Sequence, residues 1–312
     1  MVEHTIGIDI SKEHLDICCL PGGEIKQVSN DKAGFAKLIK WLGRFVVERI
    51  VYEATGSYHR GLEDALSSVG LPLVRVNPLQ ARRFAQACGV RTKTDRVDAA
   101  MLARMGVALA PDRTAVPSKT QRDLKALQVA RQALIKDGTA AKNRSICLNS
   151  SLLISQSKRR LRQIELDLKA IDAAMIELIA SDETTKRAFE IITSIPGMGA
   201  ITAAALLVEM PELGTLEAKQ AASLAGLAPY ARESGQWKGQ RFIGADRKLL
   251  REALYMPALV ACRFNPDMNR TYQTLTNAGK PPKLAITAVM RKLIILANAL
   301  VKNNRLWVPK AA

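Results

Sequence analysis

Aromatic residues and histidines are scarce in this chain. Its 312 residues include six Phe, three Trp, five Tyr and three His. So few aromatic rings disfavour a protein that holds single-stranded nucleic acid mainly by stacking bases on them. The histidines, His4, His14 and His59, all lie in the first fifth of the sequence. A Ser-His-Asp triad built on a late serine would have to reach back to them, so we discount a hydrolase of that class.

Cysteine patterns that bind zinc or build a disulfide framework are also missing. The five cysteines form no Cys-x-x-Cys pair, and their number is odd and their spacing irregular. This usage predicts free thiols in a reducing compartment, and therefore a cytoplasmic protein. No apolar run reaches about 18 residues, and the chain opens with the pattern of a strand instead of a signal peptide. We therefore expect no association with a membrane.

Negative charge is in short supply. The chain has 46 Lys and Arg against 29 Asp and Glu, which gives a formal net charge of +17. An excess of this size predicts a polyanionic partner, most simply nucleic acid, and places the protein at the nucleoid. A membrane surface is the rival partner, and the lack of a long apolar run disfavours it. The length suffices for about two domains that each bury a core.

Four of the acids lie where a metal-dependent nuclease would place its ligands. Asp9 and Glu53 each lie near the end of a run with strand character, and Asp95 and Asp98 are three residues apart. That spacing puts both of the later carboxylates on one face of a helix. Carboxylates that converge repel each other unless a cation lies between them, and hard oxygen ligands suit Mg²⁺. Any one of these acids alone is more simply a surface group or a helix cap, but the four together predict a metal site.

The chain divides into three parts, of which residues 1–112 have an α/β pattern. The pattern predicts strands at 5–10, 15–20, 24–29, 49–53 and 72–76, and helices at 32–43, 58–68, 78–87 and 95–109. Short turns between the first strands predict antiparallel pairing, and the later alternation of strands and helices predicts parallel pairing. Asp9 and Glu53 would then meet at one rim of the sheet.

Residues 113–190 are predicted to be a helical connector. Ser118 and Gln121 have the spacing of a capping box. Six apolar residues then recur at alternating spacings of three and four: Leu161, Ile164, Leu168, Ile171, Met175 and Leu178. This seam predicts a coiled coil, and the alternative is a helix packed on its own domain. The basic stretch 158–162 before the seam is either a solvated face or a strip that binds nucleic-acid backbone.

Residues 191–312 are predicted to be a second, mostly helical domain. Gly197 and Gly199 precede a helix of small residues, a pattern similar to a helix-hairpin-helix segment. Their turn would point N–H groups at a phosphate. The alternative is a glycine turn between two core helices.

Ser234 is the second sharp feature of this part. A serine hydroxyl is a weak nucleophile until another group activates it, and attack on a phosphodiester needs cations nearby. By itself a Ser-Gly in a basic loop is more often a turn. The cations around it are Arg232, Lys238, Arg241, Arg247 and Arg251.

Eight blocks of sequence, in order along nearly the whole chain, resemble the DEDD transposases of bacterial insertion sequences, the IS110 family. They are residues 7–11, 52–58, 93–99, 195–199, 225–229, 233–235, 251–256 and 287–293. The resemblance implies an α/β RuvC-like (RNase H-like) N-terminal domain, a central coiled coil and a mostly α-helical C-terminal transposase domain. Many members carry Ser-Gly-Gly followed by Lys-x-Gly-Asp. Here residues 236–237 and 245–247 depart from that pattern.

The same resemblance implies roles for residues and partners. Asp9, Glu53, Asp95 and Asp98 would hold one or two Mg²⁺ ions, and Ser234 would be the catalytic serine. Ser234 would attack a phosphodiester of donor or target DNA and form a phosphoserine linkage. A structured non-coding guide RNA, the bridge RNA of the element, would select sequence by base pairing while the basic residues hold RNA and DNA backbones. The coiled coil would join copies into a dimer or tetramer.

Three rival functions stay open. The first is a site-specific DNA invertase of the same family, which shares the chemistry and differs in its substrates. The second is a nuclease similar to Holliday-junction resolvases, because four acids suffice for two-metal hydrolysis and Ser234 would then be structural. The third is a non-catalytic nucleic-acid-binding protein.

Overall fold

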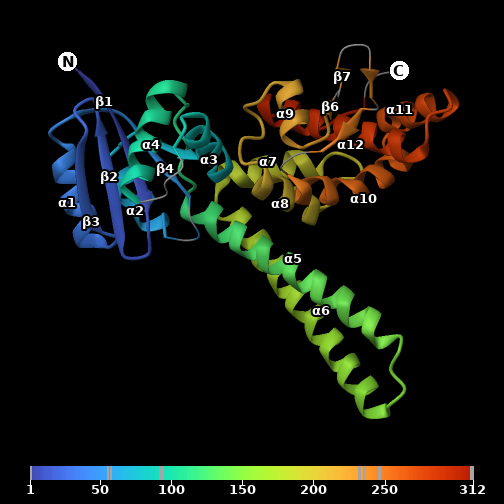
Figure 1. The fold of residues 1–312 in the computed structure, drawn as a ribbon. Coiled ribbons are helices and arrows are strands. Elements are labelled where there is room, and N and C mark those ends of the chain that lie inside the picture. The colour runs from blue at the N-terminus through green and yellow to red at the C-terminus, as the bar shows by residue number, and fades with distance from the viewer. Residues whose placement is uncertain are drawn as a thin grey trace. The chain divides into compact units, whose positions relative to one another are not determined.

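The computed structural model describes residues 2–309 except 55, 57, 91–94, 231–232, 235–236, 240 and 245–246. For residues 95, 96, 233, 234, 237 and 238 it describes the backbone alone. Contacts along the chain define two units, Met1–Pro117 and Ser118–Ala312, and each is described by itself (Figure 1).

A five-stranded sheet forms the centre of the first unit, with strand order β3-β2-β1-β4-β5. The strands are β1 (Glu3–Ile10), β2 (His14–Leu20), β3 (Glu24–Ser29), β4 (Val46–Glu53) and β5 (Leu73–Val76). β1, β2 and β3 pair antiparallel, whereas β4 is parallel to both β1 and β5. The predicted change from antiparallel to parallel pairing is therefore confirmed. Its cause is the connections, since short turns join the first three strands and a helix precedes each of the last two.

Helices cover both faces of this sheet. They are α1 (Lys32–Leu42), α2 (Arg60–Ser68), α3 (Pro78–Ala87) and α4 (Asp95–Leu109). Alternate side chains of the strands, such as Ile8 and Ile50, pack with residues of α1 and α2. Val51 and Val74 face the other way and pack with Leu102 of α4. Period-two alternation of a strand thus places two different cores on the two faces of the sheet.

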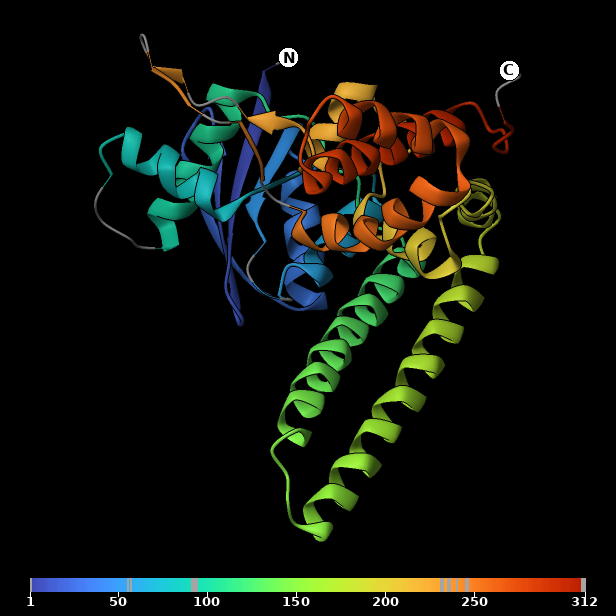
Figure 2. The same cartoon turned by 90° about the vertical axis from the view of Figure 1, so that its right-hand side faces the viewer.

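The second unit begins with a hairpin of two long helices, α5 (Lys119–Ser145) and α6 (Ser151–Ala180), which Figure 2 shows from the side. The predicted capping box is confirmed: Ser118 Oγ accepts from Gln121 N at 3.2 Å, and Gln121 Oε1 accepts from Ser118 N at 2.9 Å. Between the helices, Arg131 Nε donates to Asp172 Oδ1 at 2.5 Å. The helices therefore run antiparallel, and they are joined by a short loop at 146–150.

The inner half of the apolar seam packs within the chain. Ile171, Met175 and Leu178 contact side chains of α5 and of the two helices that follow α6. Further out, a Cβ added to Gly138 of α5 would lie 3.4 Å from Ile164 Cγ2. This is the alternative in which the helix packs on its own domain, and these seam residues need no second copy to bury them.

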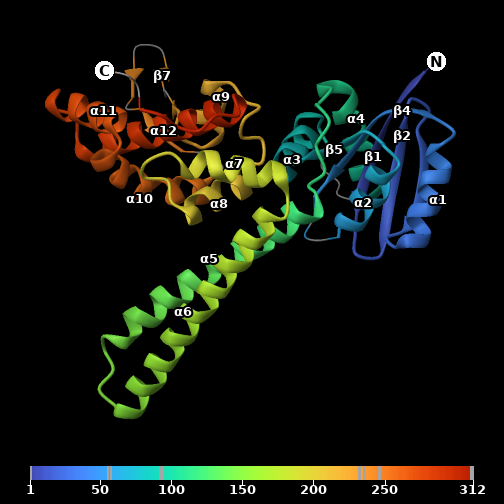
Figure 3. The ribbon, with the colours of Figure 1, turned by 180° about the vertical axis from the view of Figure 1, so that it is seen from behind.

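The rest of the second unit is mostly helical, as predicted (Figure 3). Its helices are α7 (Glu183–Thr193), α8 (Ala200–Glu209), α9 (Ala218–Leu224), α10 (Lys248–Phe264), α11 (Pro266–Asn277) and α12 (Pro282–Lys302). Its strands are β6 (Pro229–Tyr230), β7 (Glu233–Ser234), β8 (Trp237–Lys238) and β9 (Phe242–Ile243). Of the helices in the described residues, α12 alone is long and apolar enough to cross a membrane. Most of its buried residues belong to the core that α7, α8 and α10 also line, which accounts for its apolar composition.

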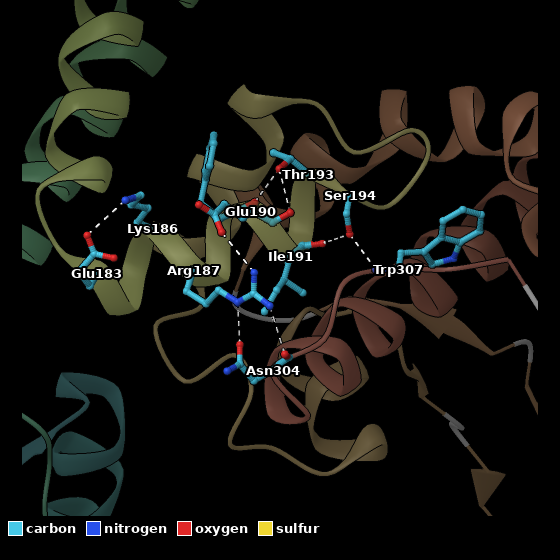
Figure 4. A network of polar contacts seen from close by, with 10 residues as sticks. Glu183, Lys186, Arg187, Glu190, Ile191, Thr193, Ser194, Asn304 and Trp307 are labelled. Carbon is cyan, nitrogen blue, oxygen red and sulfur yellow. Dashed lines mark hydrogen bonds and ion pairs between the residues drawn. The ribbon is translucent and has the colours of Figure 1, made fainter.

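The C-terminal segment is fastened to α7 (Figure 4). Arg187 Nε donates to Asn304 Oδ1 at 2.8 Å, and its Nη2 donates to Asn304 O at 3.3 Å. Trp307 N donates to Ser194 Oγ at 2.9 Å. These bonds fix the end of α7 directly before the turn that holds Gly197 and Gly199.

Candidate metal centre and the segment of Ser234

Asp9 and Glu53 lie at the same end of neighbouring parallel strands. Gly7 pairs with Val51 and Ile8 with Tyr52, so Asp9 and Glu53 occupy the next level of β1 and β4. Adjacent strands are about 4.8 Å apart, and the side chains of every second residue share a face. Both acids are half-buried. The structure therefore brings these two carboxylates to one rim of the sheet, on the face that α4 covers.

Helix α4 crosses that face antiparallel to β1. A Cβ added to Gly106 would meet Thr5 Cγ2 at 2.6 Å, and one added to Gly7 would meet Ala99 O at 2.0 Å. As β1 runs from Thr5 towards Asp9, the residues of α4 beside it thus run from the end of the helix towards its start. The first two turns of α4 therefore lie towards the rim that carries Asp9.

Asp95 and Asp98 are the acids in those first two turns. Asp98 is half-buried and precedes Ala99, whose carbonyl oxygen lies over Gly7. Asp95 is the first residue of α4, and its side chain lies outside the described part of the structure. The fold thus brings three segments with four acids to one end of the sheet.

These acids suit a hard divalent cation. Among the side chains that the structure describes, which exclude Asp95, no three His, Cys, Asp or Glu residues form a ready-made metal cluster. Mg²⁺ does not require one, because it usually binds one or two carboxylates and keeps other positions for water and substrate phosphate. Half-buried carboxylates from separate segments match that pattern.

A buried polar cluster on the opposite face of β4 was missed by sequence reasoning. The Tyr52 hydroxyl donates to the Glu63 carboxylate, and the two residues are 1% and 2% exposed. Glu63 Oε1 is also 3.6 Å from Arg75 Nη1 and 3.9 Å from His59 Nε2. Burial, followed by the Glu63 carboxylate, raises the pKa of Tyr52, so the phenol remains a donor. The available signal was a tyrosine at a core position of a strand, since a buried Tyr hydroxyl needs a partner.

Ser234 belongs to the second unit and the four acids belong to the first. It lies in β7, where Ser234 pairs with Trp237 and Glu233 pairs with Lys238 of β8. Ser234 and Trp237 therefore form the second of two residue pairs in a short antiparallel ladder, on the side next to residues 235–236 in the sequence. Its side chain, like that of Lys238, lies outside the described part, and so does all of Arg232.

The other three predicted cations have different surroundings. Arg241 is exposed. Arg247 Nη1 donates to Glu209 O at 2.8 Å, and its Nη2 donates to the Glu212 carboxylate. Arg251 is half-buried, with Nη1 2.2 Å from where a Cβ on Gly226 would stand. Arg247 therefore ties the start of α10 to the segment that follows α8, and Arg251 lies close beside Gly226.

The two glycines of the predicted phosphate-binding turn also differ. Gly197 has φ +100°, and a Cβ there would meet Ala261 N at 2.8 Å and Pro257 O at 2.9 Å. Its small size is thus explained by close packing against α10. Gly199 is the N-cap of α8, and a Cβ there would meet nothing within 4 Å. Of the two glycines, Gly199 is the exposed one.

Known proteins match both parts of the chain. Residues 6–150 match a model of DEDD transposases described as "Transposase", and residues 189–273 match "Transposase IS116/IS110/IS902 family". The pilin gene-inverting protein of Moraxella bovis is 31% identical over 320 residues, which cover 98% of each chain. This chain belongs to the IS110/IS116/IS902 family of transposases. The family resemblance drawn from the sequence is confirmed, and with it the assignment as a DNA transposase or recombinase.

The comparisons also found other similar proteins. The pilin gene-inverting protein of Moraxella lacunata is also 31% identical, over 98% of each chain. An IS900 protein of Mycobacterium paratuberculosis is 34% identical over 126 residues, which cover 38% of this chain and 31% of that protein. A solved structure of T. thermophilus RuvC with a Holliday junction substrate matches 35% of this chain and 95% of that one, with 14% identity and a TM-score of 0.29. The two family matches contain all four acids, both turn glycines and Ser234.

Proposed function

We propose that this IS110-family enzyme cuts and rejoins DNA through a covalent phosphoserine intermediate, with Ser234 as nucleophile and Asp9, Glu53, Asp95 and Asp98 as Mg²⁺ ligands. The observation that carries the proposal is the antiparallel crossing of α4 over β1. It gathers acids from three segments at one rim of the sheet. Scattered acids that only capped helices or faced solvent would not require this arrangement.

The proposed chemistry is a pair of transesterification steps at phosphorus, without net hydrolysis. Ser234 Oγ attacks the phosphorus and loses its proton to solvent, a Ser–O–P bond forms, the bond to the departing deoxyribose oxygen breaks, and that oxygen takes up a proton from solvent to become a hydroxyl. A hydroxyl of another DNA end then attacks the phosphoserine and releases Ser234, so the bond energy is retained for rejoining. One or two Mg²⁺ ions bound by the acids would neutralise the phosphate and lower the pKa of the attacking hydroxyl.

The partners in this proposal are donor DNA, target DNA and a structured guide RNA in the bacterial cytoplasm. The net charge of +17 supports binding to nucleic-acid backbones, and base pairing would supply the choice of sequence. A dimer or tetramer would allow acids of one copy to work with Ser234 of another. Exposed apolar side chains on the hairpin, such as Leu152 and Leu153, support such an assembly.

The decisive experiment for Ser234 is a denaturing gel of labelled DNA incubated with enzyme, guide RNA and Mg²⁺. Wild type should give a slow band that protease removes, and Ser234→Ala should give none. Ser223→Ala, at an exposed serine of the same unit, is the matched control and should behave as wild type. An adduct that persists in Ser234→Ala would move the nucleophile to Tyr230, Tyr255 or Tyr272. Clean cleavage without an adduct would favour a two-metal nuclease.

The metal ligands need a separate test. Asp9→Asn, Glu53→Gln, Asp95→Asn and Asp98→Asn should each abolish strand exchange while folding and nucleic-acid binding persist. The Mg²⁺-induced rise in melting temperature should shrink in each, whereas Asp112→Asn, an exposed acid of the same unit, should keep it. Recombination near the wild-type level in any two of the four variants would disprove the metal site.

DNA inversion is the second candidate function. It is favoured by the two full-length relatives, which are both named pilin gene-inverting proteins, whereas the IS900 protein is matched over 31% of its length. The two outcomes separate on two plasmid substrates. Inverted sites on one molecule would be exchanged by an invertase, and a donor junction with a separate target would be joined by a transposase.

A further inference from the structure

The α5–α6 hairpin divides sharply by charge. Its outer part, residues 138–164, contains six Lys and Arg and no Asp or Glu. The inner part, residues 119–137 and 165–180, contains six cations and six acids. One continuous hairpin is therefore neutral near the helices of its own unit and strongly basic towards its far end.

The six outer cations form one band across both helices. Gly138 lies beside Ile164, and Arg131 bonds to Asp172, which fixes how the helices align. Counting outward from these contacts places the cations of α5 level with those of α6. At a rise of 1.5 Å per residue, the α6 members span only about 6 Å of the hairpin. The outer band consists of Lys142, Arg144, Lys158, Arg159, Arg160 and Arg162, all of which are exposed.

At least three of the six cations of the inner part have acidic partners. Arg131 pairs with Asp172 at 2.5 Å, Lys125 with Glu209 at 2.7 Å and Lys169 with Glu165 at 3.0 Å. None of the six outer cations forms an ion pair in the described structure. The first acid inward from the band is Glu165. Lys169 lowers its pKa most, and Lys142 of α5 and Arg162 of α6 lower it further, so both helices contribute to one positive field.

Packing of the described fold does not require these six cations to lie so close together. The six side chains are exposed, so they cover no core. Lys158 and Arg162 are four residues apart on one helix face, and like charges at that spacing destabilise a helix. A helix face needed only for solubility would carry both positive and negative side chains, as the inner part does. A polyanion that binds the band would relieve the repulsion.

We propose that the outer band docks on the phosphate backbone of duplex DNA. Duplex DNA carries one negative charge per about 1.7 Å of its axis, which a short and dense row of cations complements. Serines and asparagine beside the band, among them Asn149, Ser150 and Ser155, can donate hydrogen bonds to the same phosphates. The inference rests on the DNA-recombining activity of the family and is independent of which residue is the nucleophile.

Binding of duplex DNA in the absence of Mg²⁺ tests the band without any strand exchange. The outer variant carries Lys158→Gln, Arg159→Gln, Arg160→Gln and Arg162→Gln. The control variant neutralises four exposed lysines of the first unit, Lys12, Lys32, Lys37 and Lys40, and so removes the same total charge. Affinity of the full-length outer variant for a short duplex of unrelated sequence should fall about 10- to 100-fold, and its log–log salt slope should flatten by about 3 to 4. The control should change far less.

Thermal unfolding of the outer and control variants shows whether a loss of DNA affinity comes from a folding defect. The outer variant should melt at the wild-type temperature or above it, because repulsion has been removed. Equal DNA affinities of the outer and control variants would overturn the proposal. So would a loss confined to duplex RNA.

A label at Cys147 gives a second and direct readout. Cys147 is exposed in the loop between α5 and α6, next to the band. With Cys88 changed to Ser, a photo-crosslinker on Cys147 should capture duplex DNA, and the capture should fall sharply when the four substitutions of the outer variant are also present. Crosslinking of Cys147 only to a second copy of the protein would overturn the proposal. Failure of the Ser234 adduct assay would leave this result unaffected.

Discussion

A Cβ atom on Gly7 would stand 2.0 Å from the carbonyl oxygen of Ala99 and 2.4 Å from the amide nitrogen of Ala103. Both of those atoms belong to the backbone of α4 and cannot move independently of the helix. The bare backbone of β1 at this position therefore sets how closely α4 lies on the sheet. Since Asp98 is the neighbour of Ala99, and Asp9 lies two residues beyond Gly7, the same contact sets the approach of the two acids.

Gly7→Ala should damage the metal centre through this contact. The new methyl group would push α4 from β1, and overpacking of this kind costs typically about 1–3 kcal/mol of folding free energy. Strand exchange should fall more than stability suggests, because the acids at the rim move with the helix. Urea unfolding and the Mg²⁺ dependence of strand exchange measure the two effects.

Gly43→Ala is the matched control for this variant. Gly43 has φ −61°, and a Cβ there would meet nothing closer than 3.5 Å. Its stability should be unchanged or slightly higher, because alanine lowers the entropy of the unfolded chain. Wild-type Mg²⁺ dependence in Gly7→Ala would show that the spacing of α4 does not govern the acids.

Local patterns were sufficient to predict the elements of the first unit. The predicted strands and helices of this unit begin and end within about three residues of their observed bounds. Contacts between residues far apart in the sequence could not be predicted from such local patterns. The partner of Ile171 proved to be a core of its own chain, and a heptad spacing alone does not say which surface fills a seam. Likewise, nothing local joins Tyr52 to Glu63, which come together only once α2 packs on the sheet.

Tyr52→Phe should destabilise the first unit. The change removes the hydroxyl that donates to the buried Glu63 carboxylate, and an unsatisfied buried acceptor costs about 1–3 kcal/mol. Because Glu53 follows Tyr52 directly, we also expect a higher Mg²⁺ requirement for strand exchange. Tyr58→Phe, at a tyrosine that is 44% exposed, should leave both quantities unchanged. Equal melting temperatures of the two variants would show that the Glu63 cluster does not brace β4.

Asp182 should make the stability of the second unit depend on pH. Its carboxylate caps α7, accepting from Thr185 N at 2.9 Å and from the Thr185 hydroxyl. The Thr185 hydroxyl and then the Thr185 N–H lower the pKa of Asp182. A lowered folded pKa stabilises above the unfolded value, about 3.9, and this contribution is lost as pH falls through the folded value. The difference in melting temperature between wild type and Asp182→Asn should therefore shrink from about pH 5 to pH 3. If this difference in melting temperature stays constant over that pH range, protonation of Asp182 does not affect the stability of the second unit.

Substitution at the two turn glycines should separate packing from binding. Gly197→Ala forces a side chain onto a backbone at φ +100° and against Pro257 O and Ala261 N. We expect it to lower stability by about 1–3 kcal/mol, since strained φ values and overpacking both cost in that range. Gly199→Ala has open space and an ordinary φ of −78°, so its melting temperature should fall much less than that of Gly197→Ala, by no more than the small cost of Ala at an N-cap. If the N–H groups at the start of α8 contact phosphate, the new methyl group lies in the path of the backbone and weakens duplex DNA binding. DNA affinity measured beside melting temperature distinguishes the cases. If Gly199→Ala binds duplex DNA with wild-type affinity, the turn only connects two core helices and does not bind phosphate.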